Sequence, residues 1–372
     1  MLSVSREQVI AFRVATQGLH RMATDAHKLA ILDIGVQDAA GDLARLAFDA
    51  RLKNPPPEDL YGPGKSLALV WSLRGAPHVH RRADLDAIAA ALFPLSEADA
   101  TSRLNETGPS VSRAGIPALE QFALATAAMR DVVRTPTAKG AASTAATKQL
   151  PAPMRRNCRA CKAAHISDSA MRLASMAAGL ELQPGTAPPV LQRRVKAKLP
   201  TRPDIAALRK LVHAYLTLLG PATLGDAAGY LEARRADVEQ AWPDDLVEVS
   251  VDGRAAWLPR TQRKALESPP EPDLVRILGP FDPFMQARDR DVIVPDRRVH
   301  KALWPILGRP SILFVDGEVA GTVRPRASGK KLTLMVEAFA SLPPPIWDDI
   351  ESEAQRVGRV RGFETTTLQR VE

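Results

Sequence analysis

The chain has 372 residues, a length that predicts more than one domain. Its 45% hydrophobic and 25% charged content is typical of a globular protein, and no apolar run approaches the ~18 residues of a membrane span. Two cysteines exclude a disulfide scaffold and the N-terminus lacks the apolar core of a secretory signal, so we expect a cytoplasmic protein. A formal net charge of +8 favours polyanionic partners such as nucleic acid.

Residues 1–110 are predicted to form a winged helix-turn-helix. A capping box at residues 5–8 starts the first helix, which should end near Gln17. The other predicted elements are a short helix over 24–32, a helix from residue 39 or 40, and strands over 67–72 and 77–80 around a turn at 74–75. Three helices followed by a hairpin are typical of this fold.

The same order recurs in residues 201–262, where the signals are clearer. Thr223, with Asp226 three positions later, marks a helix start. Asp252-Gly253 is a strong hairpin signal. The predicted elements are helices over 204–220, 221–231 and 235–242 and a hairpin over 246–259. We therefore predict a second winged helix here.

The two remaining regions are predicted less directly. Residues 111–200 hold helices over 117–134 and 168–178 around a small-residue stretch at 137–149, which fits either a divergent winged helix or a helical linker. Residues 263–372 are β-rich, with a hairpin over 311–326, a strand over 331–339, a helix over 346–358 and a β-like tail.

The stretch GPGKS (62–66) is similar to a phosphate-binding P-loop, but the pattern is incomplete. The glycine required five positions before Gly64 is replaced by Asp59. The sequence therefore favours a loop whose Lys65 contacts a DNA phosphate, or an ordinary surface loop.

Two groups of cationic or imidazole side chains are predicted to bind DNA. The first surrounds the tip of the first wing: Arg74, His78, His80, Arg81 and Arg82. The second lies on the predicted basic loop RPRASGKK: Arg324, Arg326, Lys330 and Lys331. Arginine forks suit phosphates, and a basic hairpin can brace a distorted duplex. The alternative for both groups is a solvated surface.

Cys158, Cys161 and His165 have the spacing of a zinc half-site. A structural zinc site has four ligands, so Asp168 or a distant histidine would have to complete it. The alternative is two thiols on a loop, with no cofactor in the protein.

Several stretches together resemble the winged-helix DNA glycosylases of the AlkZ/YcaQ type. They are VATQGL (14–19), GVQDAAGDLARLAFDARL (35–52), WSLRGAPHVHRRADL (71–85), AYLTLLGPATLGDAAGYL (214–231), FDPFMQARDR (281–290) and VDGEVAGTVRPR (315–326). The resemblance implies an α+β, mainly α protein with three tandem winged helices. These would occupy 1–110, 111–200 and 201–262, with a small β-rich part over 263–372, in a C shape around duplex DNA. We expect a monomer associated with the nucleoid.

The resemblance also implies a candidate catalytic site. Family members that are enzymes hydrolyse the N-glycosidic bond of alkylated purines, and some open interstrand crosslinks. Their Gln-x-Gln or Gln-x-Asp motif holds the attacking water. Gln37 matches its first position, but the second is Ala39, whose methyl group cannot hold water.

We therefore predict that Asp38, with Gln37 and with Asp33 one helical turn earlier, replaces the missing pair. The alternative is that Asp38 caps the following helix. Two functions remain open: a DNA-repair glycosylase acting on modified bases without a cofactor, and a DNA-binding protein or regulator without hydrolysis.

Overall fold

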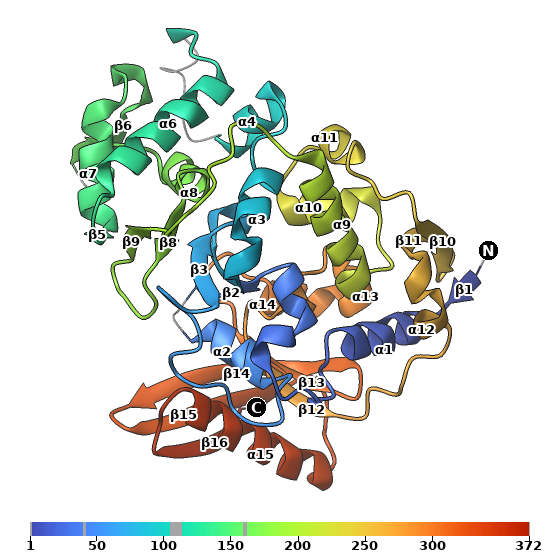
Figure 1. Ribbon diagram of the computed structural model, residues 1–372. Coiled ribbons are helices and arrows are strands. Elements are labelled where there is room, and N and C mark those ends of the chain that lie inside the picture. The colour runs from blue at the N-terminus through green and yellow to red at the C-terminus, as the bar shows by residue number, and fades with distance from the viewer. Residues whose placement is uncertain (1, 40–41, 105–113, 159–161, 372) are drawn as a thin grey trace. The chain divides into compact units, whose positions relative to one another are not determined.

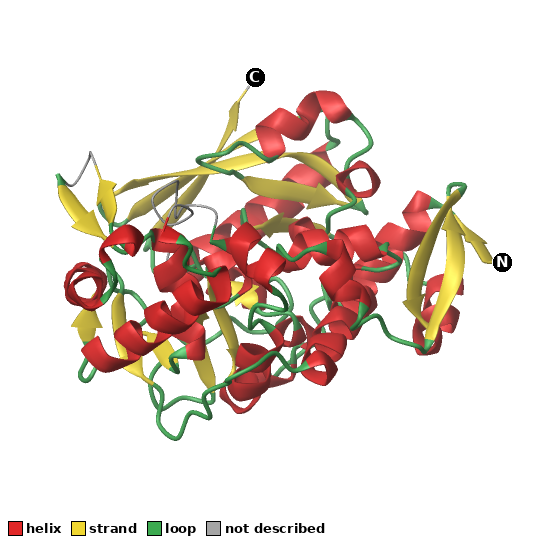
Figure 2. Cartoon of the chain, turned by 90° about the horizontal axis from the view of Figure 1, so that it is seen from above, coloured by secondary structure: helices red, strands yellow, loops and turns green. Residues whose placement is uncertain are grey.

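The computed structural model describes residues 2–39, 42–104, 114–158 and 162–371. The chain divides into two compact units. Unit 1 comprises Met1–Glu58, Ala214–Asp226 and Asp244–Glu372, and unit 2 comprises Asp59–His213 and Ala227–Pro243. Each unit mixes helices and strands, so the chain is an α+β protein (Figures 1 and 2). The four segments expected from the sequence stay a prediction, because one unit can hold more than one of them.

The N-terminal part of unit 1 begins with a short strand and a well-capped helix. Its elements are β1 (Leu2–Val4), α1 (Arg6–Thr16), 3₁₀ helices η1 (Ala26–Lys28) and η2 (Ala30–Asp33), β2 (Val36–Gln37) and α2 (Leu43–Asp49). The predicted capping box is confirmed, since the amide of Gln8 donates to Ser5 Oγ and the Ser5 amide donates to Gln8 Oε1. Val4 and Val9 are buried in one apolar cluster with Phe12.

Two helix predictions in this region were wrong. The single helix expected over 24–32 is two 3₁₀ turns, because Leu29 between them has extended backbone angles (φ −63°, ψ 127°). The helix expected from residue 39 or 40 begins at Leu43. Residues 40 and 41 lie outside the described part of the chain.

The rest of unit 1 holds two sheets. Its elements are β10 (Leu246–Val251), β11 (Arg254–Pro259), η7 (Arg260–Gln262), α12 (Arg263–Glu267), β12 (Val275–Leu278), η8 (Pro283–Gln286), α13 (Arg290–Ile293), η9 (Arg297–Val299), α14 (His300–Leu303), β13 (Ser311–Val315), β14 (Glu318–Ser328), β15 (Lys331–Ala338), α15 (Pro344–Val360) and β16 (Thr365–Val371). One sheet has the order β1-β10-β11, and the other β12-β13-β14-β15-β16.

Helix α15 covers one face of the five-stranded sheet (Figure 1). The buried side chains of β15 at Leu332, Leu334 and Val336 pack against α15. Because side chains alternate along a strand, the intervening positions 331, 333 and 335 point to the other face. Leu43 and Leu46 of α2 belong to the same apolar core, so α2 is packed onto this module.

Unit 2 contains an antiparallel sheet with the strand order β4-β3-β8-β9-β5. Its elements are β3 (Leu67–Trp71), η3 (Leu73–Gly75), β4 (Pro77–Arg81), η4 (Arg82–Asp84), α3 (Leu85–Ala91), α4 (Glu97–Arg103), α6 (Ala118–Val132), β5 (Thr137–Ala138), α7 (Lys139–Gln149), η6 (Ala152–Met154), β6 (Arg156–Cys158), β7 (Ala163–His165), α8 (Asp168–Ala177), β8 (Leu180–Leu182), β9 (Val190–Arg193) and α11 (Arg235–Glu239). Ala68 and Val70 of β3 pack against Leu85 and Ala89 of α3 and Met176 of α8.

The three helices and hairpin predicted in residues 201–262 are confirmed as elements. Helices α9 (Ile205–Leu219) and α10 (Leu224–Leu231) precede α11, and β10 and β11 follow. The Asp226 carboxylate accepts hydrogen bonds from the amide and the hydroxyl of Thr223 at 2.9 and 2.6 Å, which fixes the start of α10. Asp252 and Gly253 both have positive φ, as the predicted hairpin turn requires.

Candidate functional site

Gln37 and Asp38 lie side by side just before α2, and both are buried. Gln37 is in β2 and is 8% exposed, and Asp38 is 3% exposed. The backbone amide of Ala44 donates to Asp38 Oδ1 at 3.2 Å. Ala44 is the second residue of α2, so Asp38 satisfies one of the amides that a helix leaves unpaired in its first turn. Asp38 thus accepts an amide of the first turn of α2, but it is not the N-cap residue offered as an alternative, because α2 begins at Leu43 and its N-cap position is Asp42.

The other two residues of the predicted site are placed differently. Asp33 is the last residue of η2 and is exposed, and Ala39 is also exposed. The structure therefore buries the pair Gln37 and Asp38 and leaves Asp33 at the surface. A buried carboxylate acts through a stronger field than an exposed one, because less water screens it.

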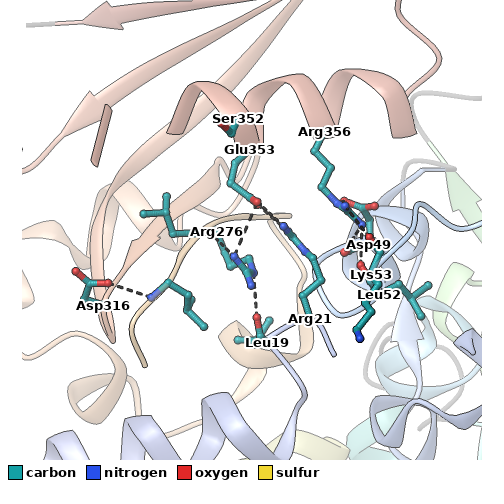
Figure 3. A network of polar contacts seen from close by, with 12 residues as sticks. Leu19, Arg21, Asp49, Leu52, Lys53, Arg276, Asp316, Ser352, Glu353 and Arg356 are labelled. Carbon is teal, nitrogen blue, oxygen red and sulfur yellow. Dashed lines mark hydrogen bonds and ion pairs between the residues drawn. The ribbon is translucent and has the colours of Figure 1, made fainter. Parts of the chain in front are cut away.

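Helix α2, whose first turn contacts Asp38, is fastened to α15 near both of its ends. Arg361, directly after α15, donates from Nε to Asp42 Oδ2 at 2.7 Å just before α2 begins. Arg356 donates to Asp49 Oδ2 at 2.7 Å at the last residue of α2, and to the Leu52 carbonyl at 2.7 Å (Figure 3). Burial raises the pKa of Asp49 despite this arginine.

A second ion-pair group lies next to it on α15 (Figure 3). Arg21 pairs with Glu353 through two contacts of 2.5 and 2.8 Å, and Arg276 of β12 lies 3.9 Å from the same carboxylate. Arg276 also donates to the Leu19 carbonyl at 2.9 Å. Burial and the nearby Arg21 lower the pKa of Arg276 to about 10. The chain segment after α1 is therefore fixed to the C-terminal sheet module.

A fully buried ion pair fixes the end of α2 from another side. Arg51 and Asp282 make two contacts of 2.8 Å, and neither side chain is exposed. Arg51 also donates to the Gln17 carbonyl and side chain. This pair was not predicted from the sequence, although Asp282 lies in the stretch FDPFMQARDR that carries the family resemblance. Such contacts hold the end of α2, Gln17 and the segment at Asp282 in one geometry.

The predicted wing-tip residues of unit 2 separate into two groups. Arg74 lies at the tip with a positive φ of 57°, donates to the Tyr230 carbonyl at 2.9 Å and covers the Tyr230 ring at 4.9 Å. His78 and His80 are 1% and 0% exposed. Burial lowers the pKa of His78 well below its ordinary value, and that of His80 to about 4. Both imidazoles are thus buried and kept neutral, an environment that does not favour phosphate contact, and their DNA binding stays a prediction.

The GPGKS loop is held by Arg82 and carries Lys65 at its surface. Arg82 donates to the Lys65 carbonyl at 2.6 Å and to the Gly62 carbonyl at 2.7 Å, and it pairs with Glu181 at 2.8 Å. Lys65 pairs with Asp59, and Arg81 lies 3.7 Å from Asp84. A P-loop lies between a strand and a helix, whereas this loop is followed by strand β3, and in the described residues 50–61 no strand element precedes it.

The basic residues at 324–331 are on strands rather than on one loop. Strand β14 continues to Ser328, so the turn is confined to residues 329–330 and the loop prediction was wrong. Arg324 and Arg326 pair in register with Met335 and Thr333 of β15. They therefore lie on the sheet face opposite α15, and both are exposed. Lys330 pairs with Glu364.

Two of the three candidate zinc ligands lie on a short hairpin. Cys158 is the last residue of β6 and His165 the last residue of β7. The hydrogen bond of the His165 ring to the Ile166 carbonyl, and its contact with the Cys158 thiol, raise the pKa of His165. Cys161 lies outside the described residues. Among the residues that the structure describes, no three His, Cys, Asp or Glu side chains form a group able to hold a metal.

Comparison with known proteins identifies the family. A family model described as DNA glycosylase AlkZ-like matches residues 31–360. The chain belongs to the AlkZ-like DNA glycosylase family. The solved structure of Streptomyces sahachiroi DNA glycosylase AlkZ is similar over 100% of both chains, with a TM-score of 0.76 and 20% sequence identity. The AlkZ-like chain therefore shares the AlkZ fold. A comparison with curated proteins found no match.

The part matched by the AlkZ-like family model includes the whole candidate site. It begins at Ile31, two residues before Asp33, and ends at Val360, the last residue of α15. In this AlkZ-like chain, Gln37, α2 and the α15 contacts that hold α2 all lie inside the match or one residue beyond it. No helix among the described residues is long and apolar enough to cross a bilayer.

Proposed function

We propose that the protein is a DNA-repair glycosylase that hydrolyses the N-glycosidic bond of alkylated or otherwise modified bases in duplex DNA. The observation that carries the proposal is a buried Gln37–Asp38 pair at a helix start, inside the region matched by the AlkZ-like family. The enzyme needs no cofactor in this account, so chelation with EDTA should leave base release unchanged.

The chemistry follows from the two side chains. In base release, the oxygen of a water molecule bonds to the sugar C1′ while the C1′–N bond breaks and its electron pair leaves with the base. Positive charge builds on the sugar, and the Asp38 carboxylate stabilises that charge and accepts the water proton. The Gln37 amide orients the water, since it both donates and accepts hydrogen bonds. Asp33, at the surface, would add a weaker and more screened field.

DNA binding is proposed to use cationic residues of both units. In unit 2 these are the exposed Lys65 and the half-buried Arg74, Arg81 and Arg82, and in unit 1 the exposed Arg324, Arg326, Lys330 and Lys331. Their contacts with phosphates would position the duplex and make binding salt-dependent. We further propose that three tandem winged helices curve around the duplex. The protein would act as a monomer, at the nucleoid in the cytoplasm.

The second candidate is a DNA-binding protein or regulator without hydrolysis. It is favoured by Ala39 at the second motif position and by the use of Asp38 Oδ1 in capping α2. Capping does not exclude chemistry, because a helix amide also fixes the orientation of the carboxylate. The two functions differ in one observable, the release of a free base.

The test is a base-release assay on duplexes carrying 7-methylguanine or a nitrogen-mustard crosslink, read as abasic sites. Gln37→Ala should abolish release without weakening duplex binding. Asp25→Asn is the control for substitution at Asp38. Like Asp38, Asp25 accepts a hydrogen bond from the amide of a helical turn, but that turn is the exposed η1. Tight duplex binding without release by the wild type would support the non-catalytic protein instead.

A further inference from the structure

The loop between α14 and β13 exposes two adjacent large apolar side chains. Ile306 is 99% exposed and Leu307 is 86% exposed. Single exposed apolar residues are normal on a protein surface, but two large adjacent ones with exposures this high are unusual. We infer that Ile306 and Leu307 form a wedge that enters the base stack of duplex DNA, an inference that rests on the proposed DNA partner.

The loop is anchored at its N-terminal end by stacked rings. The Trp304 ring contacts the His300 ring edge-to-face at 5.0 Å, and the Arg290 guanidinium covers it at 4.9 Å. Pro305 follows directly and restricts the backbone before the apolar pair. The chain therefore leaves α14 in a fixed direction.

The C-terminal end of the loop is anchored to the basic face of the sheet. Arg324 donates to the Gly308 carbonyl at 3.0 Å, and the Arg309 guanidinium lies 5.1 Å from the Phe281 ring centre. Gly308 has a φ of +66°, which turns the chain immediately after Leu307. A loop anchored on both sides loses little conformational entropy on binding, as a wedge should.

The chain segment that contains the loop carries a net positive charge, which fits duplex DNA better than an apolar protein partner. Residues 290–331 carry nine lysines and arginines against four carboxylates, a net +5 in a chain whose total is +8. Arg324, which contacts the loop, lies on the same strand face as Arg326. Apolar side chains flanked by cations are the arrangement with which proteins unstack a base step while holding the adjacent phosphates. Unstacking near a lesion would also ease access to a modified base.

The test uses a short duplex with one 2-aminopurine, whose fluorescence rises when the base is unstacked, and a fluorescein-labelled copy for affinity. Ile306→Ser with Leu307→Ser should remove the fluorescence rise and weaken binding by roughly tenfold, the loss expected when apolar contacts between bases are removed. The exchanged pair I306L with L307I keeps the apolar surface and should behave as the wild type. Val195→Ser is a matched control, because Val195 is 85% exposed in unit 2.

Salt dependence separates the wedge from the phosphate contacts. The double variant I306S with L307S should leave the slope of log affinity against log salt unchanged, whereas Arg326→Gln should reduce its magnitude by about 0.9. Thermal melting checks that the double variant is folded, and its melting temperature should equal that of the wild type because both substituted side chains are exposed.

The outcomes distinguish the wedge from the glycosylase proposal. A fluorescence rise that depends on the apolar pair supports the wedge even if no base is released. If the wild type releases base and I306S with L307S does not change the 2-aminopurine signal, the wedge is overturned and the proposed function is retained. If the wild type is a dimer in sedimentation and the double variant is a monomer with unchanged DNA binding, the two residues belong to a protein interface instead.

Discussion

Asp38 accepts a hydrogen bond from the backbone amide of Ala44 across 3.2 Å, although six residues separate them. The nominal cap position of α2, Asp42, makes no such side-chain contact with the helix and pairs with Arg361 instead. Asp38 thus accepts an amide of the first turn of α2, and Asp42 links α2 to the segment after α15. The contact gives Asp38 a structural role that any catalytic test must separate from chemistry.

The structural role of Asp38 can be measured by two substitutions. Asp38→Ala removes the acceptor of the Ala44 amide and should lower the free energy of unfolding by ~0.5–2 kcal/mol, the usual loss for a helix cap. Asp38→Asn keeps an oxygen in nearly the same place and should cost less. Urea denaturation of both variants checks this order. Equal stability of D38A and the wild type would mean that the cap contributes nothing.

The buried pair of Arg51 and Asp282 should be essential for folding of unit 1. Arg51→Met leaves an unpaired buried carboxylate and should cost ~3–5 kcal/mol of unfolding free energy. Adding Asp282→Asn removes the uncompensated charge while keeping an acceptor for the Phe284 amide, so the double variant should recover part of that loss. The free energy of unfolding is measured for both variants. If D282N lowers it in the R51M background as much as it does alone, Arg51 and Asp282 are not coupled.

His80 should make the protein sensitive to mild acid. Its pKa is about 4 in the folded state because it is buried near Arg81, against about 6.5 in an unfolded chain. Because the folded pKa is lower, the unfolded state binds more protons as the pH falls below about 6.5, and stability decreases toward the folded pKa. His80→Gln should remove this term, so the variant should gain about 2 kcal/mol relative to the wild type by pH ~5.

Parallel denaturation of the wild type and H80Q across this range gives the measurement. His80 contacts Ser72 Oγ at 2.9 Å, and glutamine can keep that hydrogen bond. An unchanged difference between the two proteins from neutral to acid pH would show that His80 does not titrate as described.

The exposed arginines of β14 should contribute to DNA affinity through phosphates alone. Arg326→Gln should weaken binding equally for intact and damaged duplexes and lower the salt slope by about 0.9. Arg324→Gln should additionally disturb the wedge loop, because Arg324 holds the Gly308 carbonyl. Affinities measured over a series of salt concentrations compare the two. Identical slopes for R326Q and the wild type would remove Arg326 from the interface.

Local signals in the sequence predicted much of the fold. The capping box at Ser5 and the turn at Asp252-Gly253 are encoded by neighbouring residues, and both are present. The prediction of one helix over 24–32 was wrong, because Leu29 has extended backbone angles and separates two 3₁₀ turns, and no neighbouring residue signals this break. Strand β14 ran further than expected because Arg324 and Arg326 are exposed on one face of a paired strand, where charge is tolerated.

The candidate site could be predicted only in part from the sequence. Gln37 and Asp38 were found through a motif, and an N-cap role for Asp38 had been weighed as an alternative, whereas the N-cap position of α2 is Asp42. The burial of His80 and the ion pair of Arg51 with Asp282 were not foreseen, because both depend on residues distant in the chain. Charge alone cannot separate a wing-tip cation from a buried imidazole.

The catalytic role of Asp38 is tested most directly by the single-turnover rate of base release from a 7-methylguanine duplex, measured for the wild type and for Asp38→Asn. We expect measurable release by the wild type and a loss of roughly 100-fold or more in D38N, typical of removing a charged group that assists the reaction. Duplex affinity and melting temperature should stay close to those of the wild type, and D25N should retain full activity. Release by D38N at the wild-type rate would contradict the catalytic role of Asp38.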